Sequence, residues 1–373
     1  MSTAPNGGFS AVDHAMMARA LQLAARGLYT TKPNPMVGCV IARGDTIVGE
    51  GWHARAGEPH AEAHALKAAG ENARGATAYV TLEPCAHHGR TPPCADALVA
   101  AGITRVVAAL RDPYNAVDGR GFAKLAAAGI EVGQGLHGDA ARELNRGFLS
   151  RLERGRPWVR VKLAMSLDGR TALASGQSKW ITSEEARADV QLWRARSGAL
   201  LTGIGTIDAD DPQLSARVPE PVDFVPPLRV VLDSRGRLDA DARVLGAGAG
   251  TLAMHAVDIV PSYGEGIDAI AVPRRGGMLD LRAVMAQLAQ REVNEVQVEA
   301  GATLCGALLD ADLVDELLLY IAPVLLGERG RPLFGGIHVA DMADRIGFRL
   351  LETERVGPDL RLLLRPAEMA MDH

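Results

Sequence analysis

The sequence predicts two successive α/β domains, the first over residues 1–155 and the second over residues 156–373. Three observations lead to this prediction. The chain has 373 residues, more than one ordinary domain needs. Amphipathic helical patterns alternate with short apolar extended runs through both halves. A helix-forming stretch over 138–155 ends in Gly-Arg-Pro before a new extended run begins, which is typical of a domain boundary.

The first half begins with a predicted helix. Ser10 can cap the pattern "AVDHAMMARALQLAARG", whose apolar residues recur at helical spacing until Gly27. Runs at 36–42 and 46–50 flank the turn "RGD" and predict a β-hairpin. Farther along, helices are expected at 60–70, 91–102 and 138–155, with strands at 76–82 and 104–110. The strands would form the middle layer of this unit.

The second half starts with the extended run "WVRVKLAMS" at 158–166 and continues with the same alternation. Helices are expected at 183–196, 280–291 and 302–311, and strands at 199–202, 228–233, 251–256 and 295–300. The Pro-rich stretch 218–227 is expected to be a surface loop and not a linker. These elements predict a second α/β domain.

Composition and charge narrow the function. Hydrophobic residues make up 47% and charged residues 23%, which is typical of a globular protein. The net charge of -5 argues against a nucleic-acid-coating surface, because phosphate binding needs a basic face. No uncharged apolar run approaches the roughly 18 residues of a membrane span, and the N-terminus lacks the pattern of a secretory signal. We expect a cytoplasmic enzyme with a small-molecule substrate, and a homo-oligomer whose size the sequence does not specify.

Four cysteines are too few for a disulfide scaffold. Cys39 and Cys305 lie in apolar runs and are expected to be buried as small hydrophobic residues. Cys85 and Cys94 are close in sequence, and with His60 they provide thiolate and imidazole ligands that suit zinc. Because three protein ligands leave one position of a tetrahedral ion open for water, the pattern predicts a catalytic zinc site.

Glu62 lies two residues after His60 and is the predicted catalytic residue. A carboxylate beside an activated water can accept its proton and deliver it to a leaving amine, as in zinc deaminases. The alternative is a closed structural zinc site in which His87 or His88 supplies a fourth ligand. The deaminase signature H-x-E followed by P-C-x-x-C is met at His60, Glu62 and Cys85, but eight residues separate Cys85 from Cys94.

This longer spacing, with "TTKPNPMVGCVI" at 30–41 and "GWHARAGEPHAE" at 51–62, resembles the deaminase half of the bifunctional riboflavin-biosynthesis deaminase/reductases. The resemblance implies a cytidine-deaminase-like three-layer domain whose substrate is a diaminopyrimidinone carrying a phosphoribosylamino group. It implies that Asn34 and His53 contact the base. It also implies that His87 and Arg90 contact the ring and the phosphoribosyl end, with a weaker indication for Asp112.

A reductase half must bind a dinucleotide, yet the G-x-G-x-x-G fingerprint is absent. "GIGTID" at 203–208 lacks the third glycine, and "GAGAGT" at 246–251 precedes a predicted strand. Instead, "VKLAMSLDGRTA" at 161–172 and "VEAGATLCGALL" at 298–309 are similar to the family's reductase half. That similarity implies a dihydrofolate-reductase-like fold that binds NADPH. The implied cofactor contacts are Ala164, Trp180, Thr206, Asp210, Ser234, Gly301, Ala302 and Thr303.

Four of these positions, Ser234 and residues 301–303, also have a physical argument. Ser234, with Arg235 beside it, offers a hydroxyl and a cation to an NADP 2′-phosphate. The backbone N–H groups of residues 301–303 open a helix after a strand and suit a pyrophosphate. For the sugar substrate, the resemblance implies contacts from Ser178, Arg194, Leu214, Arg217 and Glu299, with the two arginines as a phosphate clamp. Lys162 and Asp168 are further candidates for orienting the reacting carbon.

The sequence therefore predicts zinc-dependent deamination followed by NADPH-dependent reduction of the ribosyl group in riboflavin biosynthesis. One alternative is a nucleoside or tRNA deaminase with an unrelated C-terminal domain. The net charge and the eight-residue insert count against it. A zinc-stabilised interaction protein without activity would need a closed metal site and an inert Glu62.

Overall fold

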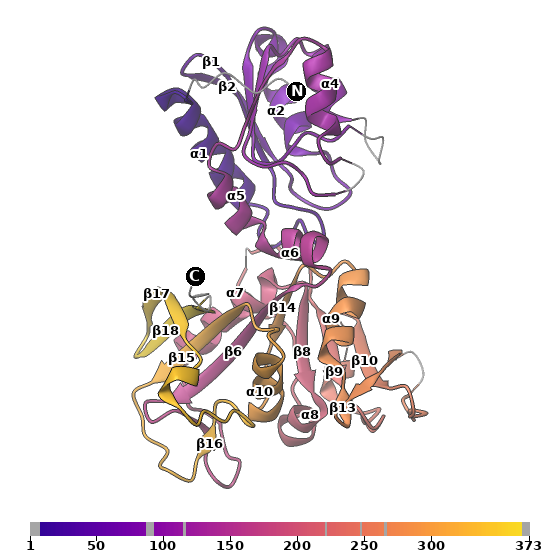
Figure 1. The fold of residues 1–373 in the computed structure, drawn as a ribbon, viewed down its shortest axis with the longest axis vertical. Coiled ribbons are helices and arrows are strands. Elements are labelled where there is room, and N and C mark those ends of the chain that lie inside the picture. The colour runs from indigo at the N-terminus through magenta and orange to yellow at the C-terminus, as the bar shows by residue number, and fades with distance from the viewer. Residues whose placement is uncertain are drawn as a thin grey trace. The chain divides into compact units, whose positions relative to one another are not determined.

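The chain forms two compact units, Met1–Arg154 and Gly155–His373. The computed structural model (Figure 1) describes residues 8–86, 93–114, 117–220, 222–246, 248–264 and 267–367. In this part of the chain, no helix combines the length and the apolar character needed to cross a membrane. Each unit has its own central sheet and its own buried core.

The first unit contains a five-stranded sheet in the order β2-β1-β3-β4-β5. β1 is antiparallel to β2 and β3, whereas β3, β4 and β5 are parallel. Its strands are β1 Gly38–Arg43, β2 Thr46–Trp52, β3 Thr77–Val80, β4 Arg105–Ala108 and β5 Glu131–Gln134. Its helices are α1 Ala11–Ala25, α2 Ala61–Ala69, the 3-10 turn η1 Gly70–Ala73, α3 Cys94–Ala100, α4 Arg120–Ala127, α5 Gly138–Leu144 and α6 Arg146–Arg154.

Two buried clusters show that this unit has three layers. One cluster joins α2, α3 and α4 to one face of the sheet, for example through Ala65, Leu98 and Leu125. The other joins α1 and α5 to the opposite face, where Met17 and Ala141 are buried. Alternate residues of a strand point to opposite faces, so Cys39 and Ile41 enter the first cluster while Val40 enters the second. The predicted three-layer architecture is confirmed.

The start of α1 follows the sequence. The Ser10 side chain accepts from the Asp13 backbone N–H, and the Asp13 carboxylate accepts in return from the Ser10 N–H, which forms a capping box. The helix predicted over 138–155 is wrong in its continuity, because it is broken into α5 and α6 at Asn145. The buried Asn145 side chain accepts from the Met36 N–H at 2.8 Å and donates to the Met36 carbonyl at 2.9 Å. This tertiary contact overrides the local helical preference.

The second unit contains a nine-stranded mixed sheet in the order β11-β10-β9-β8-β14-β6-β15-β18-β17. Its strands are β6 Trp158–Ser166, β8 Ala199–Gly203, β9 Leu228–Leu232, β10 Thr251–Ala256, β11 Asp268–Val272, β14 Glu295–Val298, β15 Glu316–Ala322, β17 Phe348–Val356 and β18 Asp359–Pro366. Two small pairs lie outside it, β12 Arg274–Arg275 with β13 Met278–Leu279, and β7 Arg170–Ala172 with β16 Arg331–Pro332. The helices are α7 Glu184–Arg196, α8 Ile204–Asp210, α9 Leu281–Gln290 and α10 Ala302–Asp310, with 3-10 turns η2 Arg243–Leu245 and η3 Met342–Asp344.

In this sheet, the seven neighbouring strands β11, β10, β9, β8, β14, β6 and β15 are parallel. β18 runs antiparallel to β15, and β17 runs antiparallel to β18. Helices α9 and α10 pack on one face of the sheet, through Met285 and Leu308 among others. Two further buried clusters involve the other helices. Val190 of α7 packs with residues of β15, and Ile207 of α8 packs with residues of β8, β9 and β10. The chain adds strands outward from β8 to β11 and then returns, so that β14 lies between β8 and β6 and the order of strand addition reverses there. In open α/β sheets, ligands bind outside the carboxyl ends of the strands at such a point.

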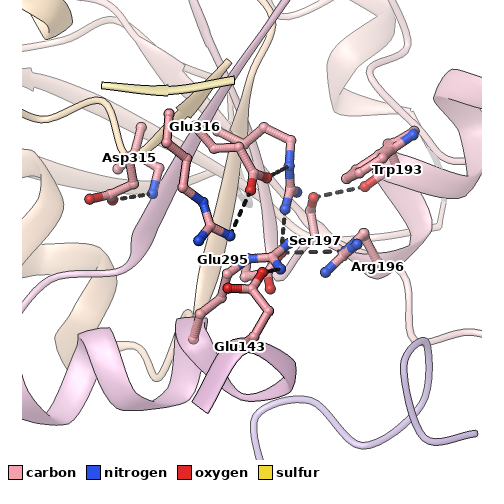
Figure 2. A network of polar contacts seen from close by, with 11 residues as sticks. Glu143, Trp193, Arg196, Ser197, Glu295, Asp315 and Glu316 are labelled. Carbon is pink, nitrogen blue, oxygen red and sulfur yellow. Dashed lines mark hydrogen bonds and ion pairs between the residues drawn. The ribbon is translucent and has the colours of Figure 1, made fainter. Parts of the chain in front are cut away.

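A buried ionic network crosses the middle of the second sheet. Arg160 on β6 is fully buried and pairs with Glu316 at 2.6 Å and with Glu295 at 2.9 Å. Figure 2 shows both glutamates with their dashed contacts, including the pair between Glu295 and Arg196. The Arg160 guanidinium also lies 4.7 Å from the centre of the Trp193 ring. Removing one partner would leave an uncompensated buried charge, so this network links β6, β14 and β15 through their side chains.

Candidate active sites

Three side chains converge in the first unit as predicted. His60 immediately precedes α2, Cys85 follows β3, and Cys94 is the first residue of α3. His60 Nδ1 lies 3.6 Å from Cys85 Sγ and 3.3 Å from Cys94 Sγ, and the three ligand atoms lie within 4.8 Å of one another. Around a tetrahedral zinc, nitrogen and sulfur ligands would be about 3.6 Å apart. The donor set and its spacing therefore fit zinc.

The electrostatics of the two thiols are coupled. Hydrogen bonding from the Cys94 thiol, together with His60 and the Cys94 backbone N–H at 3.3 Å, lowers the pKa of Cys85 to about 4 although burial opposes this. The same contact with Cys85, reinforced by burial, raises the pKa of Cys94. Hydrogen bonding to Cys85 raises the pKa of His60. The protein alone thus stabilises one thiolate, and a bound divalent cation would be required to stabilise the second.

Glu62 lies in the first turn of α2 and is only 3% exposed. Burial raises the pKa of this carboxyl, while attraction to His60 acts in the opposite direction. A buried carboxyl beside the cysteine and histidine ligands is suited to carrying a proton. The position of α2 depends on β2, because Gly51 packs directly against the helix backbone. A Cβ at Gly51 would lie 2.4 Å from the Ala61 carbonyl oxygen.

Asn34 and His53 lie together beside this site. The Asn34 amide nitrogen is 3.0 Å from His53 Nε2, and His53 Nδ1 is 3.2 Å from the Pro59 carbonyl oxygen. This arrangement fits a neutral imidazole that donates from Nδ1 and accepts at Nε2. Burial lowers the pKa of His53, which favours the same state. The His53 and His60 rings are 5.5 Å apart, so this pair adjoins the predicted metal ligands. His87 and Arg90 lie outside the described residues.

Glu83 is a structural residue that the sequence reasoning missed. Its carboxylate accepts from the backbone N–H groups of Asp112, Gly119, Gly121 and Phe122 at 2.9 to 3.3 Å. Asp112 is itself buried and accepts from the Tyr114 N–H. Because Glu83 is two residues before Cys85, it fixes the segment around Asp112 next to the ligand loop. The available signal was a carboxylate next to the apolar strand in "TLEPC".

Several predicted cofactor contacts of the second unit follow the carboxyl ends of neighbouring parallel strands. Thr206 is in α8 after β8, Ser234 follows β9, and Gly301 caps α10 after β14. Ala164 is half-buried on β6, and Thr303 is exposed in the first turn of α10 beside Ala302. Asp210 pairs with Lys179 at 3.4 Å. Trp180 is 69% exposed and stacks 4.5 Å from the Arg187 guanidinium.

The predicted sugar-phosphate residues include a strong ion pair. Arg194 binds Glu299 through two hydrogen bonds of 2.7 Å and donates to the Ser215 carbonyl. In this structure Arg194 is therefore engaged by protein groups on both sides. Arg217 donates to the Gln213 side chain at 3.2 Å, Leu214 is buried with a positive φ of 48°, and Ser178 is half-buried.

Lys162 belongs to the same cluster. Burial lowers its pKa, although attraction to Glu299 opposes the change. Burial alone would raise the pKa of Glu299, but Arg194, Lys162 and Gln297 together lower it to about 2. The Lys162 ammonium nitrogen lies 5.7 Å from the Tyr320 ring centre. Lys162 from the middle of β6, Arg194 from α7 and Glu299 just after β14 thus place two cations and one carboxylate in one largely buried region.

Comparison with known families assigns each unit. Residues 10–110 match the cytidine and deoxycytidylate deaminase zinc-binding region, and residues 157–362 match the RibD C-terminal domain. The second match contradicts the alternative of a deaminase with an unrelated C-terminal domain. The first supports zinc as the metal of the His60, Cys85 and Cys94 site.

Similarity to individual proteins covers nearly the whole chain. The riboflavin biosynthesis protein RibD of Escherichia coli is 50% identical over 362 residues, covering 94% of this chain and 99% of the relative. The Haemophilus influenzae RibD is 47% identical over 375 residues, covering 96% and 98%.

Solved structures agree with these relatives. A RibD structure from Acinetobacter baumannii superposes with a TM-score of 0.89 at 47% identity, covering 96% of this chain and 99% of that one. A Thermotoga maritima deaminase/reductase superposes with a TM-score of 0.85 at 33% identity, covering 95% and 99%. The chain, with an N-terminal deaminase domain and a C-terminal reductase domain, therefore belongs to the RibD family of riboflavin biosynthesis enzymes.

Proposed function

We propose that the first unit deaminates 2,5-diamino-6-(5-phosphoribosylamino)pyrimidin-4-one. We propose that the second reduces the resulting 5-amino-6-(5-phosphoribosylamino)uracil to the ribitylamino product with NADPH. The observation that carries the proposal is the convergence of His60, Cys85 and Cys94 beside buried Glu62, on a chain that also has the RibD C-terminal domain. The Thermotoga maritima relative is described by these two activities.

In the deaminase site, His60, Cys85 and Cys94 would hold the zinc. A bound zinc supplies a Lewis acid that makes water a nucleophile near neutral pH. Glu62 would accept a proton from the water and deliver it to the departing amine. Asn34 and His53 offer hydrogen-bonding groups beside the ligands, which suits recognition of the polar edge of a pyrimidinone.

In the reductase unit, a bound NADPH supplies the hydride. The N–H groups at the start of the nine-residue α10 suit its pyrophosphate, and Ser234 with Arg235 suits its 2′-phosphate. The cluster of Lys162, Arg194 and Glu299 would bind the phosphoribosyl part. The Arg194 bonds to Glu299 and to the Ser215 carbonyl would orient the guanidinium, and each terminal nitrogen keeps a second N–H group for a phosphate.

Glu62→Gln tests the deaminase assignment. The substitution keeps size and polarity but removes the base, so deamination should fall by at least about 100-fold. Zinc content should not change, because Glu62 is not a ligand. The variant should still reduce the deaminated substrate at a near-normal rate when that substrate is supplied directly. As a matched control, Cys94→Ser should lose zinc and deamination together. Retained deamination in the Gln variant would remove Glu62 from the mechanism.

The choice of NADPH is tested by the unmodified protein. Reduction with NADPH should be clearly faster than with NADH at equal, subsaturating concentrations, because only NADPH carries the phosphate that Ser234 and Arg235 would bind. Equal use of both cofactors would contradict this choice. The cytoplasmic location and the homo-oligomer stay predictions of the sequence.

A further inference from the structure

Residues 323–335, which we call the strap, connect three neighbouring strands at their carboxyl ends. The strap leaves the end of β15, passes the turn after β6, and reaches the first turn of α10, which follows β14. Its far end is bound by the Gly335 N–H, which donates to the Ala302 carbonyl at 2.9 Å. Because β14, β6 and β15 are adjacent in the sheet, the strap crosses the edge where the predicted cofactor contacts lie.

Asp168 binds the near end of the strap. One carboxylate oxygen accepts from the Leu326 N–H at 3.1 Å, and the other accepts from the Gly327 N–H at 2.7 Å. The Ser166 hydroxyl donates to the same carboxylate at 2.5 Å and accepts from the Arg170 N–H at 3.0 Å. Hydrogen bonds from Ser166 and the strap lower the pKa of Asp168 to about 2, so the group is ionised throughout the neutral range.

The strap makes few apolar contacts that could hold it in place without the Asp168 hydrogen bonds. The first part of the strap is largely exposed, with Leu325 at 72% and Val324 at 42%. Leu333 and Phe334 pack against the core only near the far end. Segments with little apolar burial depend on their polar contacts for a fixed position. Beyond this segment, residues 331 and 332 are held by the pairing of β16 with β7. Between β15 and that pairing, residues 324–329 are bound to the turn after β6 by the Asp168 carboxylate and by the backbone bond from the Leu167 N–H to the Val324 carbonyl.

We propose that Asp168 is a positioning residue for NADPH binding, because its carboxylate holds the strap across the carboxyl ends of β6 and β14 as one wall of the cofactor site. This inference rests on the proposed reductase function. The strap is attached at one end to Asp168, four residues after Ala164, and at the other end to the Ala302 carbonyl. Both attachments therefore adjoin predicted cofactor contacts. The carboxylate acts through the strap and does not take part in the chemistry.

Asp168→Asn is the first test. The amide has one acceptor oxygen, so its NH2 group would face one of the strap N–H groups, donor against donor. The KM and the dissociation constant for NADPH should rise roughly ten-fold, the scale of a lost hydrogen bond to a charged group. Deamination should be unchanged, and kcat should change far less than KM. Asp168→Glu, which keeps the charge, should recover part of the affinity.

A matched control and a second readout separate positioning from general stability. Asp341 is an exposed residue whose carboxylate also accepts a backbone N–H, that of Ala343 at 2.8 Å, so Asp341→Asn should leave NADPH affinity unchanged. Trypsin can cleave the strap after exposed Arg329. NADPH should protect this bond in the unmodified protein, and Asp168→Asn should be cleaved faster with or without NADPH.

The far attachment offers an independent variant. A Cβ at Gly306 of α10 would lie 1.9 Å from the Gly335 carbonyl oxygen, so Gly306→Ala should displace the strap and raise the NADPH KM as well. An unchanged KM and an unchanged cleavage rate in Asp168→Asn would overturn the proposal while leaving the reductase function intact. A parallel loss of kcat, of NADPH affinity and of thermal stability of the second unit would also overturn it, since Asp168 would then be only structural. Failure of the unmodified protein to oxidise NADPH would instead overturn the proposed function.

Discussion

Glu299 belongs to the predicted sugar-phosphate site and also stabilises the folded second unit. It is 14% exposed, it binds Arg194 through both carboxylate oxygens, and Gln297 donates to it at 2.9 Å. Its counter-charges come from β6 and α7, far away in sequence. Removal of the negative charge would therefore leave Arg194 and Lys162 together in a largely buried region, which is costly.

Glu299→Gln should lower the unfolding free energy of the second unit by about 3 kcal/mol at pH 6. The folded-state pKa of about 2 lies below the unfolded value, so this stabilisation is present above about pH 4.3. It is lost as the pH falls toward 2, because the wild-type carboxyl then becomes neutral too. Denaturant unfolding at pH 6 and pH 3 should show a smaller difference between the two proteins at pH 3.

The exposed Glu220 provides the control, since Glu220→Gln should leave the unfolding free energy within about 0.5 kcal/mol of wild type at both pH values. A Glu299→Gln deficit that did not shrink between pH 6 and pH 3 would contradict the lowered pKa.

At the scale of elements, the contact between β2 and α2 positions His60, the proposed metal ligand, and Glu62, the proposed catalytic residue. Gly49 and Gly51 are two residues apart and face the same side of β2, which α2 covers. A Cβ on Gly51 would meet Ala61, the residue between His60 and Glu62, whereas a Cβ on Gly49 would lie 2.3 Å from the Ala65 carbonyl oxygen farther along the helix. The absence of these two side chains lets helix and strand approach closely.

Gly51→Ala and Gly49→Ala form a matched pair. Each should destabilise the first unit by about 1 to 3 kcal/mol through overpacking. Only Gly51→Ala should also markedly weaken zinc binding, because it displaces the start of α2. Competition with a chelator measures the affinity of each variant. Equal loss of zinc affinity in both would indicate that the first turn of α2 does not set the ligand geometry.

For the whole molecule, the separate cores predict separate responses to ligands. Zinc removal should lower the thermal transition of the first unit, because the ligand thiolates would lose their counter-charge. NADP+ at about 100 times its Kd should stabilise the second unit by roughly 2.7 kcal/mol. Calorimetry of the full chain, with and without chelator and NADP+, measures both effects. A chelator effect of equal size on both transitions would contradict the independence of the two cores.

Local sequence was sufficient for much of the fold. Ser10 caps α1, Ser183 caps α7 and Asp280 caps α9 close to the expected positions, because capping depends on residues within one turn. Cys39 and Cys305 are fully buried as expected from the apolar runs around them. The prediction of one continuous helix over 138–155 was wrong because the Asn145 side chain binds the backbone of Met36, 109 residues earlier. No local pattern encodes that partner.

The sequence by itself predicted the side chains that converge as a possible metal site and the two-unit pattern. Histidine, glutamate and two cysteines at characteristic spacing restrict the metal and the reaction, and hydrophobic periodicity records which faces are buried. Only the tertiary structure decided which distant groups neutralise one another. It brought Glu299 to Arg194, Glu83 to the backbone around Asp112, and Asp168 to the strap. These pairings depend on strand order and on chain direction within a sheet, which are long-range properties that residue spacing does not contain.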